Sequence, residues 1–178
     1  MTDSKPARFI RHLQKLQEDR GAMAALRRIL ASEPGQPIDA RAYRYVEPYV
    51  EDESEWQRAM YYLVAGLFAL HPQQGEQTLA EALSDLWLQD QQRDQQRSST
   101  ETRFLALLDS DPDQLPDRLR RVVAYLRSKN KGLDYQRLLI DLLQWRRPDR
   151  RVQQRWARQF YRTSQQPTEN EAPREVEA

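Results

Sequence analysis

The chain has 178 residues, of which 39% are hydrophobic and 31% are charged; its net charge is +1 and it contains no cysteine. The lack of cysteine excludes disulfide bonds, thiolate nucleophiles and cysteine-ligated zinc. Residues 1–8 are polar, and the longest apolar stretch, residues 60–70, is too short to span a membrane. We therefore expect a cytoplasmic protein with no signal peptide and no membrane partner.

Five helices are predicted in the first half of the chain, from apolar residues that recur at helical spacing. They span residues 5–18, 22–30, 40–45, 55–70 and 79–88. The Arg20-Gly21 pair is expected to separate the first two helices, and Ser54 is expected to cap the N-terminus of the fourth. The fourth helix is apolar around most of its circumference, so it should be central, and His71-Pro72 should end it.

Four further helices follow residues 89–97, a segment rich in Gln, Arg and Asp that should form an exposed loop or a frayed helix end. They span residues 99–108, 116–128, 135–145 and 148–162. Ser98 and Glu101 match a capping box at the start of the first of these helices. Because proline is tolerated in a first turn but not in a helix interior, later helices should begin near Pro116 and at Pro148.

The predicted fold is therefore all-α, a helical bundle of about nine helices in two small lobes. We expect an N-terminal helical lobe over residues 1–97, a basic C-terminal helical lobe over residues 98–162 and a disordered acidic tail over residues 163–178. Residues 1–90 carry 10 basic and 14 acidic groups, net −4, whereas residues 91–162 carry 17 and 9, net +8. A basic second half is typical of a protein with an anionic partner.

The last predicted helix carries arginines along one side. At about 100° per residue they fall within about 80° of arc, and they are Arg147, Arg151, Arg155, Arg158 and Arg162. Val152, Trp156 and Phe160 occupy a separate apolar sector that should anchor the helix. Like charges in one stripe repel one another, and few carboxylates are placed to neutralise them. The pattern therefore favours phosphate binding over a solvated surface helix.

Further basic residues cluster near other predicted helix ends. The larger group comprises Arg118, Arg120, Arg121, Arg127, Lys129 and Lys131, and the smaller is the pair Arg27 and Arg28. Lys129 and Lys131 follow a predicted helix C-terminus, and Arg27 and Arg28 lie near another; cations there also interact favourably with the helix dipole, which accounts for part of these groups without a ligand. A structural role and ligand contact are equally consistent with each group. The candidate nucleic-acid-binding residues beside the stripe are Arg27, Arg28, Arg120, Arg121, Lys129 and Lys131.

Most aromatic residues lie at the helical spacing of core positions, although aromatic rings can also stack on bases. Burial is expected for Trp56, Phe104, Trp145, Trp156 and Phe160. The tyrosines Tyr43, Tyr45 and Tyr49 are less regularly spaced and could be exposed.

No catalytic pattern is present in the sequence. His12 and His71 are the only histidines and lack an accompanying carboxylate motif, and there is neither a P-loop nor a glycine-rich dinucleotide turn. The acidic cluster at residues 51–53 is expected to cap and solubilise its turn. We therefore expect a protein that is not an enzyme, with no catalytic residue, no metal site and no cofactor.

Short segments between residues 9 and 161 form an ordered set, although no single segment is specific. They are Arg20-Gly21, Leu26-Arg27-Arg28, Leu67 to Pro72, Ser98 to Glu101, Arg103-Phe104, Leu119-Arg120-Arg121, Leu133-Asp134-Tyr135, Asp141-Leu142-Leu143, Trp145, Val152, Trp156-Ala157 and Phe160-Tyr161. In this order they resemble the CasB family, the small subunit of the type I-E CRISPR Cascade complex.

The resemblance implies an all-α, non-catalytic subunit of an antiviral ribonucleoprotein. Its implied partners are the guide RNA, single-stranded and target DNA, other Cascade subunits and a second copy of itself. By position, Arg27, Arg28, Arg120 and Arg121 match basic positions of the family, and the stripe from Arg147 onward resembles its basic C-terminal helix less closely. A helical adaptor that binds an acidic partner protein is the alternative, and a helical transcription regulator is a weaker third possibility.

Overall fold

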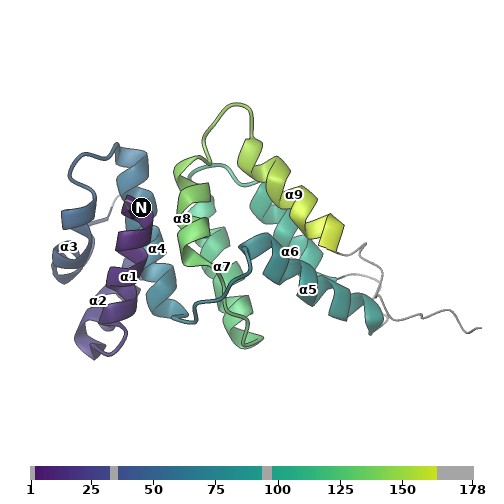
Figure 1. The fold of residues 1–178 in the computed structure, drawn as a ribbon, viewed down its shortest axis with the longest axis horizontal. Helices are drawn as coiled ribbons and strands as arrows, with labels where there is room; N and C mark the ends of the chain where they lie inside the picture. Colours follow the sequence, from purple (N-terminus) through teal and green to yellow (C-terminus); the bar gives the residue numbers. More distant parts are fainter. Residues whose placement is uncertain (1–2, 33–35, 94–97, 164–178) are drawn as a thin grey trace, which may run out of the picture.

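The computed structural model describes residues 3–32, 36–93 and 98–163, and this part of the chain is helical (Figure 1). Its nine α-helices are α1 (Lys5–Leu16), α2 (Arg20–Arg28), α3 (Ala40–Val46), α4 (Glu55–Leu70), α5 (Leu79–Gln92), α6 (Ser99–Leu108), α7 (Leu115–Ser128), α8 (Tyr135–Leu143) and α9 (Arg151–Thr163). Two 3₁₀ turns, Ile29–Ala31 and Glu47–Tyr49, follow α2 and α3. In these ranges the β pairing is limited to an isolated bridge between Gln74 and Leu133. The all-α prediction is confirmed.

Two predicted boundaries near the N-terminal half are wrong. Helix α2 begins at Arg20, because Asp19 acts as its N-cap and accepts a hydrogen bond of 3.0 Å from the backbone N–H of Ala22. Gly21 therefore lies inside the first turn of α2 and does not separate α1 from α2. Helix α5 continues to Gln92 and not to residue 88, so the start of the 89–97 segment is a helix end, the second of the two predicted alternatives, and not a loop; residues 94–97 lie outside the described ranges.

The predicted start of the last helix at Pro148 is also wrong. Helix α8 ends at Leu143, and α9 begins only at Arg151. Arg150 has a φ of 48°, which lies in the left-handed region and interrupts a right-handed helix. Pro148 therefore lies in a turn between the two helices.

Capping explains why the other helices start where the sequence predicts. Ser54 and Gln57 form a reciprocal capping box at the start of α4. Helix α7 carries Pro116 in its first turn, as expected. At α6 only half of the predicted box is present, because Ser98 caps the helix while the carboxylate of Glu101 accepts a hydrogen bond from the Tyr161 hydroxyl at 2.9 Å.

Helix α4 is the central element, and its residues from Met60 to Ala69 are all buried. It packs against α2, α3, α7 and α8, while α5 packs against α6 and α9. Figure 1 shows α1 to α4 on one side, α5, α6 and α9 on the other, and α7 and α8 between them. The boundary between two lobes at residues 97 and 98 remains a prediction. No helix in the described ranges has the length and apolarity needed to cross a membrane.

The expected aromatic core is confirmed for four of its five members. Phe104, Trp145, Trp156 and Phe160 are buried. Trp56 is half-buried and donates a hydrogen bond from Nε1 to the carbonyl oxygen of Leu142 at 3.0 Å. Of the three less regular tyrosines, Tyr43 is exposed, whereas Tyr45 and Tyr49 pack partly against the core.

Candidate nucleic-acid interface

Helix α9 is held to the rest of the protein by its apolar side. Val152, Trp156 and Phe160 are buried, as the sequence predicts. The Phe160 ring stacks on Phe104 with centroids 4.1 Å apart, and the Ser84 hydroxyl donates a 2.5 Å hydrogen bond to the Phe160 carbonyl oxygen. Large buried aromatic rings contribute most to such packing, so the position of the arginines on the other side of α9 is fixed by the core.

The loop before α9 is organised by one carboxylate, Asp149. Its Oδ2 atom lies 3.3 Å from a guanidinium nitrogen of Arg147 and 3.3 Å from one of Arg151. Its Oδ1 atom accepts a 3.2 Å hydrogen bond from the backbone N–H of Arg151. The hydrogen bond from Arg147, followed by that from the Arg151 backbone, holds the pKa of Asp149 below its ordinary value. Asp149 is therefore an ionised group that two arginines share.

Arg150 fastens the same loop to the neighbouring helix. Its Nη2 atom donates a 2.7 Å hydrogen bond to the carbonyl oxygen of Leu108, at the C-terminal end of α6. A cation at a helix C-terminus also faces the negative end of the helix dipole. The hydrogen bond to Leu108 thus offsets part of the energetic cost of the left-handed backbone conformation of Arg150. The sequence pattern did not identify this residue.

Arg155 differs from the other arginines of the stripe because it is committed to a buried partner. Its guanidinium contacts Oδ1 of Asp141, whose side chain is only 2% exposed, and Trp156 Nε1 donates a 2.6 Å hydrogen bond to Oδ2 of the same carboxylate. Burial raises the pKa of Asp141, and the Trp156 hydrogen bond and the Arg155 charge oppose that rise. Asp141 therefore ties α8 to α9 through two bonds.

The expectation that few carboxylates neutralise the stripe is wrong for three of its four candidate residues. Arg147 and Arg151 share Asp149, and Arg155 contacts Asp141. Arg158 is exposed, and no ion pair joins it to a carboxylate in the part of the chain that the structure describes. An excess of positive charge nevertheless remains, because residues 146–158 contain six arginines and a single acidic residue.

The second basic group lies along α7 and the turn after it. Arg120 and Arg121 share Asp117, at 3.7 and 3.0 Å, and both are exposed. The Lys129 ammonium lies 5.7 Å from the centroid of the Tyr125 ring. Lys131 is half-buried and lies 3.0 Å from Asp85, which reduces its availability to a ligand. Exposed pairs of this kind contribute little to stability and leave the guanidinium groups accessible.

The pair on α2 is divided between two roles. Arg27 donates a 3.3 Å hydrogen bond from Nε to the carbonyl oxygen of Ala69, and so satisfies an acceptor at the C-terminal end of α4. Arg28 lies 2.9 Å from Asp39, the N-cap residue of α3, and its side chain is about half exposed. Both residues have a structural partner, and neither is excluded from the surface.

Some of the candidate residues lie near two opposite ends of α4. The turn of Lys129 and Lys131 lies at the C-terminal end, where His71 Nε2 is 2.6 Å from the Lys131 carbonyl oxygen; Arg27 reaches the same end. The loop that carries Arg147 lies at the N-terminal end, because Trp56 bonds the last turn of α8. Helix α4 has 16 residues, which separates its ends by about 24 Å at 1.5 Å per residue. Figure 1 shows the two loops at the top and bottom of α8.

Comparison with known protein families shows to which family this chain belongs. The model of the family described as CRISPR-associated protein Cse2 matches residues 22–161. The chain belongs to the Cse2 family. The Cse2-family chain is 43% identical over 179 residues to Cse2 of Thermus thermophilus, an alignment that covers 96% of this chain and 97% of that relative. The resemblance to CasB is thereby confirmed.

Solved structures agree with this assignment. CasB from Thermus thermophilus is similar with a TM-score of 0.73 at 42% identity, over 88% of the Cse2-family chain and 97% of its own length. CasB from M. ruber gives 0.74 at 37% identity, over 91% and 95%. A chain of a CRISPR RNA-guided surveillance complex gives 0.75 at 27% identity, over 90% and 93%.

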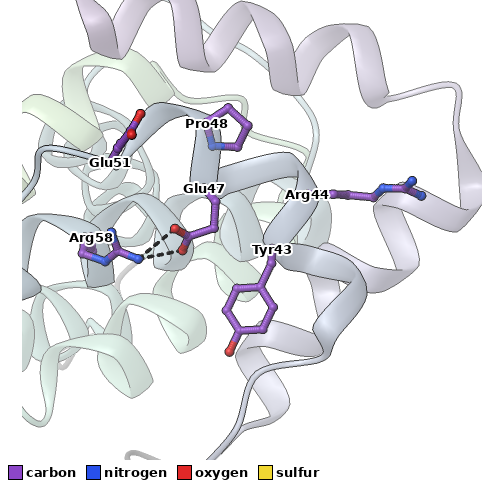
Figure 2. Close-up of a pocket in the computed structure, with 6 residues that line it drawn as sticks. All are labelled: Tyr43, Arg44, Glu47, Pro48, Glu51 and Arg58. Atoms are coloured by element: carbon purple, nitrogen blue, oxygen red, sulfur yellow. Dashed lines mark hydrogen bonds and ion pairs between the residues drawn. The ribbon is translucent and has the colours of Figure 1, made fainter.

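One surface hollow of the Cse2-family chain lies beside the 3₁₀ turn that follows α3. It has a volume of about 570 Å³ and is lined by Tyr43, Arg44, Glu47, Pro48, Glu51 and Arg58 (Figure 2). Figure 2 shows both carboxylate oxygens of Glu47 paired with Arg58, each at 2.8 Å. The hydroxyl of Tyr62 donates to the same carboxylate at 2.6 Å, and this bond lowers the pKa of Glu47. That carboxylate is thus committed to structure.

Several basic residues at the surface of the Cse2-family chain were missed by the sequence analysis. Arg146 lies over the Trp56 ring at 5.4 Å. Arg103, which the sequence favoured as structural, lies over the Tyr125 ring at 4.7 Å. A third group lies on α1 around Tyr49 and lines a second hollow. Only the α1 group could have been found from the sequence, because its basic residues are spaced so that they share one face of the helix. The negative net charge of residues 1–90 obscured this pattern.

Proposed function

We propose that this chain is the non-catalytic small subunit of a type I-E CRISPR surveillance ribonucleoprotein in the cytoplasm. In this role it binds phosphate groups and so stabilises the hybrid of guide RNA and target DNA and the displaced non-target strand. Its other partners are further subunits of the complex and a second copy of itself. Membership of the Cse2 family and the likeness to a chain of a surveillance complex support this proposal.

The observation that carries the proposal is the arginine density around the start of α9. Residues 146–158 hold six arginines and one acidic residue, and buried Trp145 and Trp156 fix the loop and the helix that present them. Guanidinium groups are planar, permanently charged and suited to paired hydrogen bonds with phosphate oxygens. A rigid arginine surface without a deep pocket matches a polymer backbone better than a small ligand.

Phosphate contacts fit the division of labour in an RNA-guided complex. Base pairing between guide and target supplies the sequence specificity, so a subunit beside the hybrid needs only to hold backbone. We assign this role to Arg147, Arg151 and Arg158 first, and to Arg27, Arg28, Arg120, Arg121, Lys129, Lys131 and Arg155 as further contacts. The committed ion pairs of Arg155 and Lys131 place them last in that order.

The test is binding of fluorescent single-stranded DNA by an Arg147→Glu/Arg151→Glu variant over a series of salt concentrations. Each phosphate contact releases condensed counterion, so the slope of log affinity against log salt should become shallower by roughly 0.7 per lost contact. An Arg147→Gln/Arg151→Gln variant accompanies it, because glutamates beside Asp149 add repulsion. The matched control is Arg41→Glu/Arg93→Glu, which makes the same change of charge at exposed positions without a carboxylate ion pair in the described ranges.

Both variants at Arg147 and Arg151 should lose affinity equally for all base sequences, while the control keeps the wild-type slope. Wild-type affinity and slope in the Glu and Gln variants would refute the assignment. If these variants instead lose binding to an acidic protein subunit and keep DNA binding, the helical adaptor is the correct function.

A further inference from the structure

Helix α1 carries a cationic stripe that the sequence analysis did not assign. Arg8, Arg11, His12 and Lys15 fall within about 100° of arc at the helical repeat. Their side chains lie at the surface, His12 being half-buried, while Phe9 and Leu13 on the other side of α1 are buried. The core therefore fixes which face of α1 the cations occupy. The Cse2 family match begins at residue 22, so this helix lies outside it.

These four residues and Tyr49 line a surface hollow of about 290 Å³. Tyr49 and His12 stack with ring centroids 5.0 Å apart and planes inclined by 30°. His12 Nε2 donates a 3.1 Å hydrogen bond to the Tyr45 carbonyl oxygen, which holds the imidazole in place. The hollow thus has a fixed flat aromatic wall beside its cations.

The positive charge of the hollow comes from the two arginines and the lysine. Burial lowers the pKa of His12, the Lys15 charge lowers it further, and the hydrogen bond to Tyr45 opposes the shift, so the imidazole is neutral at neutral pH. Arg11 contacts Asp3. No ion pair joins Arg8 or Lys15 to a carboxylate in the ranges that the structure describes, unlike Lys5 on the same helix, which lies 2.6 Å from Glu53.

The dimensions and chemistry of the stripe fit a polyanionic strand. From Arg8 to Lys15 the axis rises by about 10 Å, so the cations are spread along the helix and can contact successive phosphates of one strand. A flat aromatic surface beside cations is the composition of sites that hold single strands by stacking and phosphate contact. An acidic peptide would use the cations alone, whereas a nucleic-acid strand can also stack a base beside them.

We propose that the hollow formed by α1 and Tyr49 is a second binding site for single-stranded nucleic acid, held by Arg8, Arg11 and Lys15 on phosphate and by the aromatic pair on a base. The inference rests on the proposed function in that its ligand is nucleic acid, but it uses a different surface. Helix α1 packs against α8, whereas the site around Arg147 lies in the loop beyond the end of α8. The two sites can therefore be removed separately.

The experiment compares full-length Arg8→Glu/Lys15→Glu with the control Arg41→Glu/Arg93→Glu in anisotropy titrations of fluorescent oligo-deoxythymidylate and oligo-uridylate. The control also changes one residue near a helix start and one at a helix end. Loss of two contacts should make the salt slope shallower by about 1.4, so the advantage of wild type should be about sevenfold larger at 50 mM than at 200 mM salt. An Arg8→Gln/Lys15→Gln variant, with its melting curve, separates loss of contact from altered folding.

The imidazole of His12 provides a local readout that a folding defect would not mimic. The chain has two histidines, and His71 is buried at 4% exposure, so the ring signals in a nuclear magnetic resonance spectrum can be assigned with a His12→Asn variant. Either oligonucleotide should shift the His12 signal in wild type, and the Arg8→Gln/Lys15→Gln variant should lose this shift; the His71 ring, which is bonded to the Lys131 carbonyl oxygen, reports on a different surface. A shift of the His12 signal with both oligonucleotides supports a site that binds the nucleic-acid backbone. A shift with only one of them supports the same site with a preference for DNA or for RNA.

Three outcomes would overturn the inference. The first is an Arg8→Glu/Lys15→Glu variant that binds both oligonucleotides like the control. The second is a His12 signal that responds to polyglutamate and to neither oligonucleotide, which would identify an acidic protein surface as the ligand. The third is a salt slope equal to that of wild type in the Gln variant. If Arg8→Glu/Lys15→Glu weakens binding and Arg147→Glu/Arg151→Glu does not, the α1 site is supported and the assignment of Arg147 and Arg151 is refuted. If only Arg147→Glu/Arg151→Glu weakens binding, the α1 site is refuted and the proposed function is not.

Discussion

Replacing Asp141 by alanine should destabilise the protein more than replacing its partly exposed partner Arg155. The Asp141 side chain is 2% exposed and accepts from both Trp156 Nε1 and Arg155. In Asp141→Ala the buried indole N–H has no acceptor, which costs about 1–3 kcal/mol. The lost Arg155 contact adds about 1 kcal/mol at most, because that side chain is 38% exposed and solvent screens its charge.

The expected loss in Asp141→Ala is therefore about 1–4 kcal/mol. For a chain of this length each kcal/mol corresponds to roughly 2–4 °C of melting temperature, so the midpoint should fall by about 2–16 °C. Asp141→Asn keeps an oxygen acceptor for Trp156 and removes only the charge, so its loss should be about 1 kcal/mol. Calorimetry and urea unfolding measure both variants.

Two results would contradict this reasoning. A melting temperature of Asp141→Ala within about 2 °C of wild type would show that the buried contact between α8 and α9 does not stabilise the fold. Equal losses in Asp141→Ala and Asp141→Asn would show that the charge, and not the acceptor for Trp156, is the important property of the residue.

Three further predictions follow from other contacts. Arg158→Ala should weaken binding of single-stranded DNA more than Arg155→Ala does, because Arg155 is committed to a buried carboxylate; anisotropy titrations measure both. Burial raises the pKa of Tyr61 to about 12; its stabilising effect is complete below the ordinary value of 10.0 and is lost as pH rises through 12, which alkaline difference spectroscopy and unfolding curves follow. Gly75→Ala places a Cβ 2.8 Å from a backbone carbon of the facing turn and should cost roughly 1–3 kcal/mol in urea unfolding, whereas Gly21→Ala meets only a side-chain oxygen at 3.4 Å and should be near neutral.

Local signals made most of the fold predictable. Ser54 caps α4 through neighbouring residues, so the start of that helix can be read from a few positions of sequence. The start of α9 could not be read in this way, because it depends on the left-handed backbone of Arg150 and on its bond to Leu108, a residue 42 positions earlier. Proline at a first helical position is a preference, and here a tertiary contact overrode it.

The candidate site was less predictable than the fold, because ion pairs join residues that are distant in sequence. Helical spacing correctly placed Arg151 and Arg158 on the exposed side of α9 and Trp156 in the core. Spacing within one helix could not reveal that Arg155 contacts Asp141 on a different helix. Net charge summed over a long segment likewise concealed the α1 stripe, since the charge of a surface depends on which residues share a face.

If Arg147 and Arg151 bind phosphate as proposed, the position of Asp149 between them has a consequence for how quickly a bound strand can leave. Arg147 and Arg151 already hold an anion, so an arriving phosphate exchanges with a resident carboxylate instead of meeting bare cations. Each such exchange has a small net free energy, and Asp149 can form its ion pairs with the two arginines again when the phosphate dissociates. A strand held by several replaceable contacts owes its residence time to their number and can be released one contact at a time.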